Sequence, residues 1–169
     1  MNVDYIHALY DYHYGMYNRV WDCIMHLADD QFVQEVRYSI GSVRNHMIHV
    51  LAIDQRWIAR LRGQDLPEYL SPDKYVTRNA VRGEWDKAVD YVMTYVDNVD
   101  EGELARTINF DFSDQATKRV YASPVWQVLM HVANHGTDHR AQVLRILHDF
   151  DAPTLEQDFL WWDTWDTEN

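Results

Sequence analysis

The sequence predicts an all-α protein: a four-helix bundle with a small β-ribbon or extended segment between its third and fourth helices. Four long stretches carry apolar residues at helical spacing. Glycine and proline are scarce, at 6 and 4 of 169 residues, which disfavours an all-β fold because such a fold needs many tight turns. Hydrophobic residues make up 47% of the chain and aromatic residues 14%, which is too much for a disordered protein.

The helices are expected at Asp4–Ala28, Ser42–Gly63, Arg78–Val99 and Ser123–Phe150. Ser42 is a good N-cap for the second helix, and Gly63 is a good C-terminal stop. In the fourth helix, Ser123 would be the N-cap and Pro124 the first helical residue, where proline is favoured.

The connections between these helices are long, so the sequence leaves the order of helix directions open. Gln64–Thr77 joins the second and third helices. Thr107–Phe112 and Thr117–Tyr121 flank residues 113–115 and predict a β-hairpin or extended ribbon. The tail after Pro153 is rich in aromatic residues that are costly to expose, so we expect it to pack on the bundle or on a second subunit. Its large apolar residues are Phe159, Leu160, Trp161, Trp162 and Trp165. No linker divides the chain, which predicts a single domain over residues 1–169.

Charge and composition exclude several function classes. The chain has 27 Asp and Glu against 15 Lys and Arg, a net charge of -12, which disfavours binding to nucleic acid or to an anionic membrane. No apolar run approaches the ~20 residues that span a bilayer. The first basic residue is Arg19, so a signal peptide is not expected. Cys23 is the single cysteine, lies among apolar residues, and is expected to be buried. We therefore expect a cytoplasmic protein.

The chain has 9 histidines, and two of them occupy the inward face of the fourth helix. That face is otherwise mainly aliphatic, and consists of Val125, Val128, Val132, His135, His139, Gln142 and Ile146. Residues four apart lie one turn apart on one side of a helix, so His135 and His139 are spaced to bind one metal ion. The second helix carries His46 and His49, and either could supply a third imidazole.

Other metal sites are disfavoured because their motifs are missing from the sequence. It has no Glu-x-x-His motif of the di-iron bundles and no His-Glu-x-x-His motif. A single mononuclear site with three histidines and open positions is the pattern that remains, and it is typical of a catalytic metal.

Residues 41–54 (GSVRNHMIHVLAID) and 131–143 (HVANHGTDHRAQV) resemble the second and last helices of the DinB/YfiT-like metalloenzyme family. The resemblance covers nearly the whole chain. In that family an acid follows the helix-two ligand by five residues, as Asp54 follows His49, so the resemblance selects His49 over His46. It implies that His49, His135 and His139 are the metal ligands. The chain departs from the family pattern at Met16–Asn18, Asp138 and Ala141, none of which is a ligand.

The remaining candidates have weaker support. His13 lies on the apolar face of the first helix and is either a hydrogen-bonded core histidine or a residue that lines the metal cavity. His131 is expected to be a core or surface histidine, although it could assist at the site, and His46 is expected to be structural or exposed. Asp54 points about 140° away from His49 around the helix, which favours an ion pair with a neighbouring helix. Asp138 and Arg140 flank the second ligand but point elsewhere.

The resemblance implies a metal-dependent enzyme that uses Zn, Ni or Fe. We expect thiol-dependent transfer or isomerisation, with a small molecule such as bacillithiol, mycothiol or glutathione as the activated nucleophile. A metal-dependent hydrolase is the alternative, and a non-catalytic metal-binding stress-response protein is a second. The protein is expected to form a homodimer.

Overall fold

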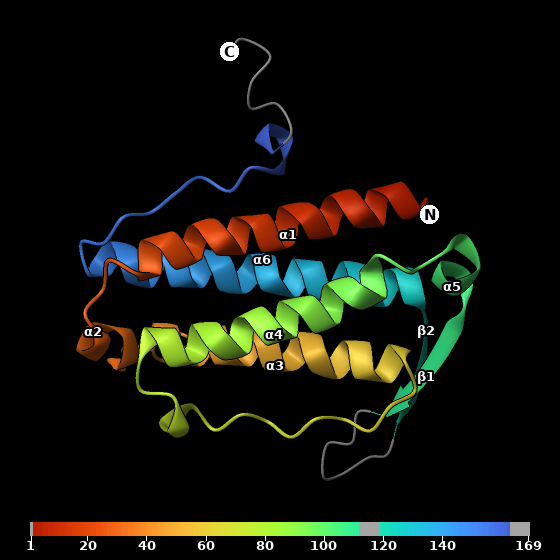
Figure 1. The fold of residues 1–169 in the computed structure, drawn as a ribbon, viewed down its shortest axis with the longest axis horizontal. Helices are drawn as coiled ribbons and strands as arrows, with labels where there is room; N and C mark the ends of the chain where they lie inside the picture. Colours follow the sequence, from red (N-terminus) through yellow and green to blue (C-terminus); the bar gives the residue numbers. More distant parts are fainter. Residues whose placement is uncertain (1, 112–118, 163–169) are drawn as a thin grey trace.

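Four long helices form the body of the protein, and the computed structural model describes residues 2–111 and 119–162. Figure 1 shows them packed side by side, with a short two-stranded ribbon at one end. The long helices are α1 (Val3–Ile24), α3 (Val43–Leu61), α4 (Arg78–Val96) and α6 (Val125–Asp149). The shorter elements are α2 (Asp29–Val33), η1 (Pro72–Lys74), α5 (Glu101–Ala105), β1 (Thr107–Asp111), β2 (Val120–Pro124) and η2 (Phe159–Trp161). The prediction of an all-α bundle with a small ribbon is confirmed.

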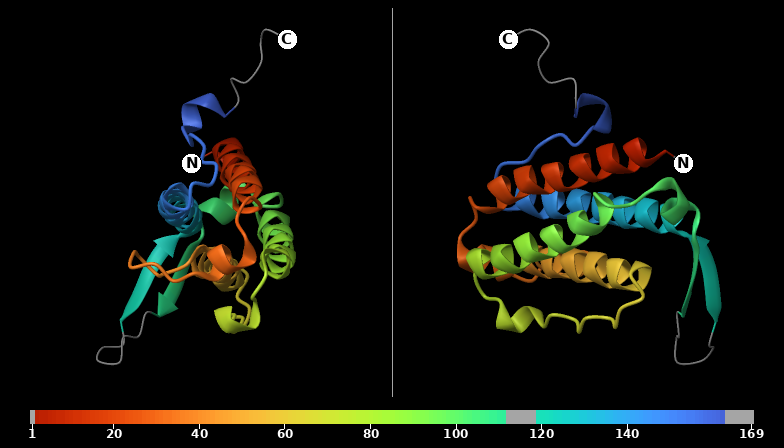
Figure 2. Two further views of the ribbon diagram at one scale, coloured as in Figure 1. Left: turned by 90° about the vertical axis from the view of Figure 1, so that its left-hand side faces the viewer. Right: turned by 45° about the vertical axis from the view of Figure 1, so that its right-hand side comes forward.

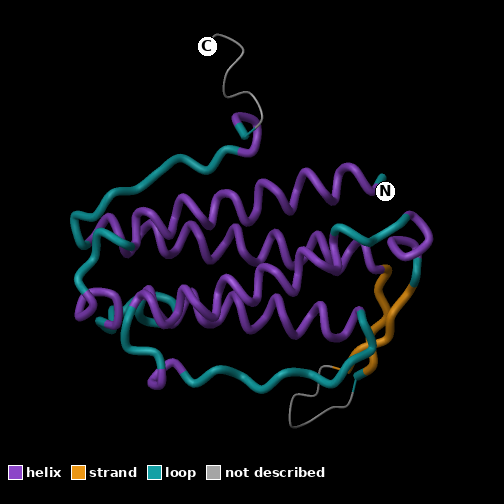
Figure 3. Tube along the Cα trace, viewed as in Figure 1, coloured by secondary structure: helices purple, strands orange, loops and turns teal. Residues whose placement is uncertain are grey.

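The helices are not arranged up-down-up-down. Following the chain in Figures 1 and 3, α3 and α4 run in the same direction, and α1 and α6 run in the opposite one. The long connection between α3 and α4 returns along the whole bundle, which makes this parallel pair possible. Each long helix packs against two others: α3 against α4 and α6, and α1 against α6 and α4. Figure 2 shows the same arrangement from the end and from the side.

Two helices, α1 and α4, end earlier than predicted. α1 stops at Ile24, four residues before the expected end, because Ala28 is already extended as the N-cap of the unpredicted helix α2. α4 stops at Val96 rather than Val99, shortly before the unpredicted helix α5. The predicted start of α3 is confirmed, since the Ser42 hydroxyl accepts a hydrogen bond from the Asn45 amide at 3.2 Å. Gly63 has a φ of 65° just after α3, as a stop residue should.

The start of α6 corrects the predicted cap. Pro124 is the N-cap rather than the first helical residue, and Ser123 lies in β2. The ribbon is the reason, because its pairing continues to the helix: Thr107 opposes Pro124, and the Val125 amide donates to the Arg106 carbonyl at 2.9 Å. The two strands pair antiparallel, from Asp111 opposite Val120 onward. The predicted turn at residues 113–115 and the inner strand ends at Phe112 and Thr117 lie outside the described residues.

The aromatic tail packs along α1. The Trp162 indole donates to an Asp11 carboxylate oxygen at 2.9 Å, and its ring covers Gly15, where a side chain would collide with it. Phe159 meets Tyr12 edge-on, with ring centroids 4.8 Å apart. The tail thus contacts α1 through Phe159 and Trp162, whereas Leu160 and Trp161 are exposed, and Trp165 lies outside the described residues. Among the described helices, none is long and apolar enough to cross a membrane.

Close approach of α1 and α6 depends on a glycine. A Cβ atom added at Gly136 would overlap the ring of His13, which is fully buried. Tyr17 reinforces the contact by donating its hydroxyl to the Gly136 carbonyl at 2.8 Å. The α1–α6 interface is therefore closed at the turn of α6 that carries His135 and His139.

We predict opposite effects for two glycine substitutions. Gly136→Ala should lower the free energy of unfolding by about 1–3 kcal/mol, because His13 has no room to move aside. Gly83→Ala is the matched control, since Gly83 is exposed within α4 and a Cβ atom added there would meet no other part of the described chain within 4 Å. It should raise stability by up to about 1 kcal/mol through helix propensity alone. Urea unfolding of both variants measures this, and a stabilised Gly136→Ala protein would contradict the proposed contact.

Candidate metal centre

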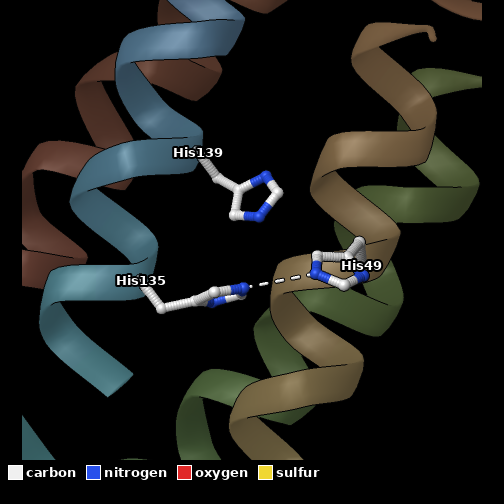
Figure 4. Close-up of side chains that lie close together, drawn as sticks. All are labelled: His49, His135 and His139. Carbon is white, nitrogen blue, oxygen red and sulfur yellow. Dashed lines mark hydrogen bonds between the residues drawn. The ribbon is translucent and has the colours of Figure 1, made fainter. Parts of the chain in front are cut away.

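Helices α3 and α6 bring three histidines together midway along the bundle. His49 comes from α3, and His135 and His139 come from successive turns of α6. Each offers one ring nitrogen, and these three nitrogens all lie within 4.8 Å of one another. Figure 4 shows the three rings turned toward one another between the two helices. These are the three residues that the sequence analysis selected as ligands.

The spacing of the nitrogens fits a small divalent ion. Nε2 of His49 lies 3.2 Å from Nε2 of His135. Two nitrogens bound at about 2.0–2.1 Å to a tetrahedral metal would be about 3.3 Å apart. The ring of His139 stands 4.7 Å from that of His49 and 4.5 Å from that of His135, measured between centroids. Three convergent imidazoles at these separations could bind a metal ion.

A fourth histidine borders the group. His46 lies one turn before His49 in α3 and is fully buried, and its Nδ1 is 2.9 Å from Nδ1 of His139. Of the two expectations for His46, structural or exposed, the second is wrong: it is buried and hydrogen-bonded to one of the candidate ligands. Its position three residues before His49 was the available sequence signal, because that spacing places both rings toward the same neighbouring helix.

Burial keeps the imidazoles of this centre neutral. It lowers the pKa of His46 and of His135 from 6.5 to about 4, and in both cases other histidines of the group add repulsion. Burial also lowers the pKa of His49, against an opposing effect of Asp54. At His139, burial and His49 lower the pKa, and Asp138 and then Asp54 oppose them. A neutral imidazole is the form that binds a metal, so the four rings are in the required state at neutral pH.

Two of the three candidate ligands are partly exposed to solvent. His49 and His135 are half-buried, whereas His139 is 7% exposed. Three protein ligands with an accessible side are typical of metal sites that bind a further molecule. The arrangement can therefore hold an ion and still present it to a small ligand.

Arg140, His13 and Asp54 form a buried polar chain on the other side of the two helices. The Arg140 guanidinium donates to Nδ1 of His13 at 3.1 Å and to the His13 carbonyl at 3.2 Å. Nε2 of His13 lies 3.7 Å from Asp54, which also accepts the Tyr14 hydroxyl at 3.0 Å. His13 is thus a hydrogen-bonded core histidine outside the three-histidine group. Asp54 contacts α1, but through a tyrosine hydroxyl and a histidine whose pKa is lowered by burial, so the contact differs from the expected ion pair.

The other candidates lie outside the group as well. His131 is exposed, and its ring centroid is 6.2 Å from that of His135 and 5.6 Å from that of Trp57. Asp138 is exposed and accepts a hydrogen bond from Gln142 at 2.7 Å. Cys23 is 8% exposed, and burial raises the pKa of its thiol, as expected of a small core residue.

Comparison with known proteins gives one consistent result. The family model described as the DinB family matches residues 1–168. A curated relative, Protein DinB of Bacillus subtilis (strain 168), is 19% identical in an alignment 161 residues long that covers 92% of this chain and 92% of the relative. The crystal structure of a DinB-like protein from Bacillus cereus superposes with a TM-score of 0.60, at 14% identity, over 81% of this chain and 88% of that one. At that identity the structural match concerns the fold alone, whereas the family model spans nearly every residue. The chain therefore belongs to the DinB family.

Proposed function

We propose that the protein is a metal-dependent enzyme in which His49, His135 and His139 hold one divalent transition-metal ion, with Zn, Ni and Fe as the candidates. The observation that carries this proposal is the convergence of three neutral imidazole nitrogens from two helices beside solvent. Imidazole accepts all three metals, so the donor set alone does not choose among them.

Thiol-dependent transfer or isomerisation is the chemistry we favour. A divalent ion with three neutral ligands keeps its full positive charge and acidifies a thiol or water that binds beside it. A thiolate is the nucleophile that complements such a charge, which supports a low-molecular-weight thiol such as bacillithiol, mycothiol or glutathione as co-substrate. The half-buried rings of His49 and His135 leave that side of the centre accessible to it.

Any proton transfer at the centre would use a histidine other than His13, which lies in the core. His13 is 0% exposed and already accepts a hydrogen bond from Arg140, so it exchanges no proton with solvent in this conformation. His131 is exposed one turn before His135 on α6. We therefore assign any shuttling of protons to His131.

The proposal also covers the molecules that the protein binds. We expect a small-molecule substrate and, given the net charge of -12, no nucleic acid. We also expect a homodimer, which sedimentation equilibrium would measure.

The ligand assignment predicts loss of stoichiometric metal on single substitution. His49→Ala, His135→Ala and His139→Ala should each leave well under one equivalent of metal after purification, because two imidazoles hold a divalent ion far more weakly than three. His148→Ala is the control, since this exposed histidine at the end of α6 faces solvent. Elemental analysis with circular dichroism checks the result, and full occupancy in folded variants would refute the site.

The enzyme proposal predicts metal-dependent consumption of thiol. Protein reloaded with Zn, Ni or Fe should accelerate the reaction of one of the three thiols with 1-chloro-2,4-dinitrobenzene, and His135→Ala should not. Parallel assays with amide and ester substrates test the hydrolase alternative. If the loaded protein turns over none of these, it is instead a non-catalytic metal-binding protein.

The lowered pKa values predict how stability depends on pH in metal-free protein. His46 and His135 have folded-state pKa values of about 4 against 6.5 when unfolded, so the unfolded state takes up protons first as the pH falls. Their contribution to stability is complete above about pH 6.5 and is lost progressively toward pH 4. Urea unfolding with chelator present, between pH 7 and 4.5, measures this slope. His135→Asn should make it shallower, and an unchanged slope would contradict the assignment.

A further inference from the structure

His46 contacts the metal centre without belonging to its three candidate ligands. It is 0% exposed, and its ring meets that of His139 with centroids 5.1 Å apart and planes at 61°. The shortest contact joins the two Nδ1 atoms, at 2.9 Å. A separation of 2.9 Å between two ring nitrogens is a hydrogen bond, so one nitrogen carries the proton and the other accepts it.

The direction of this hydrogen bond follows from the ligand role of His139. With Nδ1 of His139 occupied by His46, the nitrogen left to face His49 and His135 is Nε2. A ligating nitrogen carries no proton, so the single proton of neutral His139 must be on Nδ1. His139 is then the donor and Nδ1 of His46 the acceptor. The opposite direction would place a proton on the nitrogen that faces the centre.

We propose that His46 is a positioning residue for the metal centre, which accepts the Nδ1–H of His139 and holds that ring with its Nε2 toward His49 and His135. The inference rests on the metal-binding function proposed above. It adds a residue that acts through a ligand rather than on the metal.

Two observations support a specific role for this contact. Among the described residues, Nδ1 of His135 has no hydrogen-bond partner. His46 therefore gives His139 a fixed partner of a kind that His135 lacks. The other nitrogen of His46, Nε2, is also buried without a partner in the described part of the chain. An unpaired buried polar atom costs stability, and a leucine would fill the same place without that cost. The imidazole is therefore explained by the hydrogen bond it makes.

Cobalt titration of three variants tests the proposal. His46→Leu removes the acceptor, and by analogy with other partners of ligating histidines it should weaken Co²⁺ binding about 10–100-fold and alter the visible spectrum of the bound ion. His46→Asn can present an amide oxygen where Nδ1 stood, and should restore most of the affinity. Ile58→Ala is the control for general destabilisation, because Ile58 is buried in the same helix three turns away. It should bind Co²⁺ as the wild type does.

The outcomes separate this inference from the proposed function. A wild-type protein that binds no Co²⁺ overturns both. Wild-type affinity and spectrum in His46→Leu overturn the positioning role alone, as does an equal loss in the Leu and Asn variants. If His46→Leu does not fold, long-range ¹H–¹⁵N correlation spectra of the wild-type protein with and without Zn²⁺ decide the matter. They should show His139 protonated on Nδ1 and His46 on Nε2, and a proton on Nε2 of His139 in the Zn²⁺-loaded protein refutes the proposal.

Discussion

The buried chain from Arg140 through His13 to Asp54 is the interaction on which the position of the metal centre depends. It joins α6, α1 and α3, the three helices that meet around the site, through two contacts with His13. Because arginine has no acceptor, it must donate to Nδ1 of His13, which leaves the proton of the neutral ring on Nε2, facing Asp54. A guanidinium and a carboxyl group lie at opposite ends of the chain, while Nε2 of His13 and Oδ1 of Asp54 have no hydrogen-bond partner among the described residues. The ring of His13 fits there because Gly136 has no side chain.

Two of these helices, α3 and α6, carry the imidazoles of the metal centre on a different side from the one that contacts α1. His139 and Arg140 are consecutive in α6, yet one faces α3 and the other faces α1. In α3, His49 and Asp54 are five residues apart and also face opposite neighbours, α6 and α1. A rotation of either helix would therefore break polar contacts on both sides at once. This double attachment, rather than the histidines alone, explains how ring nitrogens on separate helices come to lie about 3 Å apart.

Local sequence patterns predicted the features that involve only one helix. The His135–His139 pair follows from a spacing of four on an aliphatic face, and the Ser42 cap and the Gly63 stop follow from backbone chemistry at α3. Features that depend on how two helices pack against each other could not be predicted from such patterns. The role of His46 needs the register of α3 against α6, and the parallel direction of α3 and α4 is set by a connection that carries no periodic signal. Pro124 was misassigned because strand pairing with Thr107 outweighed its preference for the first helical turn.

The electrostatics of the centre depend on the same buried chain. Burial alone would make His49, His135 and His139 weak bases and therefore weak ligands for a cation. Asp54 opposes that effect at all three, raising each pKa against the larger influence of burial. The carboxyl does so from the α1 side, without occupying a position at the metal, because its contacts go to Tyr14 and His13. Asp54 thus acts on all three ligands from behind, and at His139 the neighbouring Asp138 adds a larger effect in the same direction. An ion bound there would keep three neutral ligands and an open side while its ligands stay basic enough to hold it.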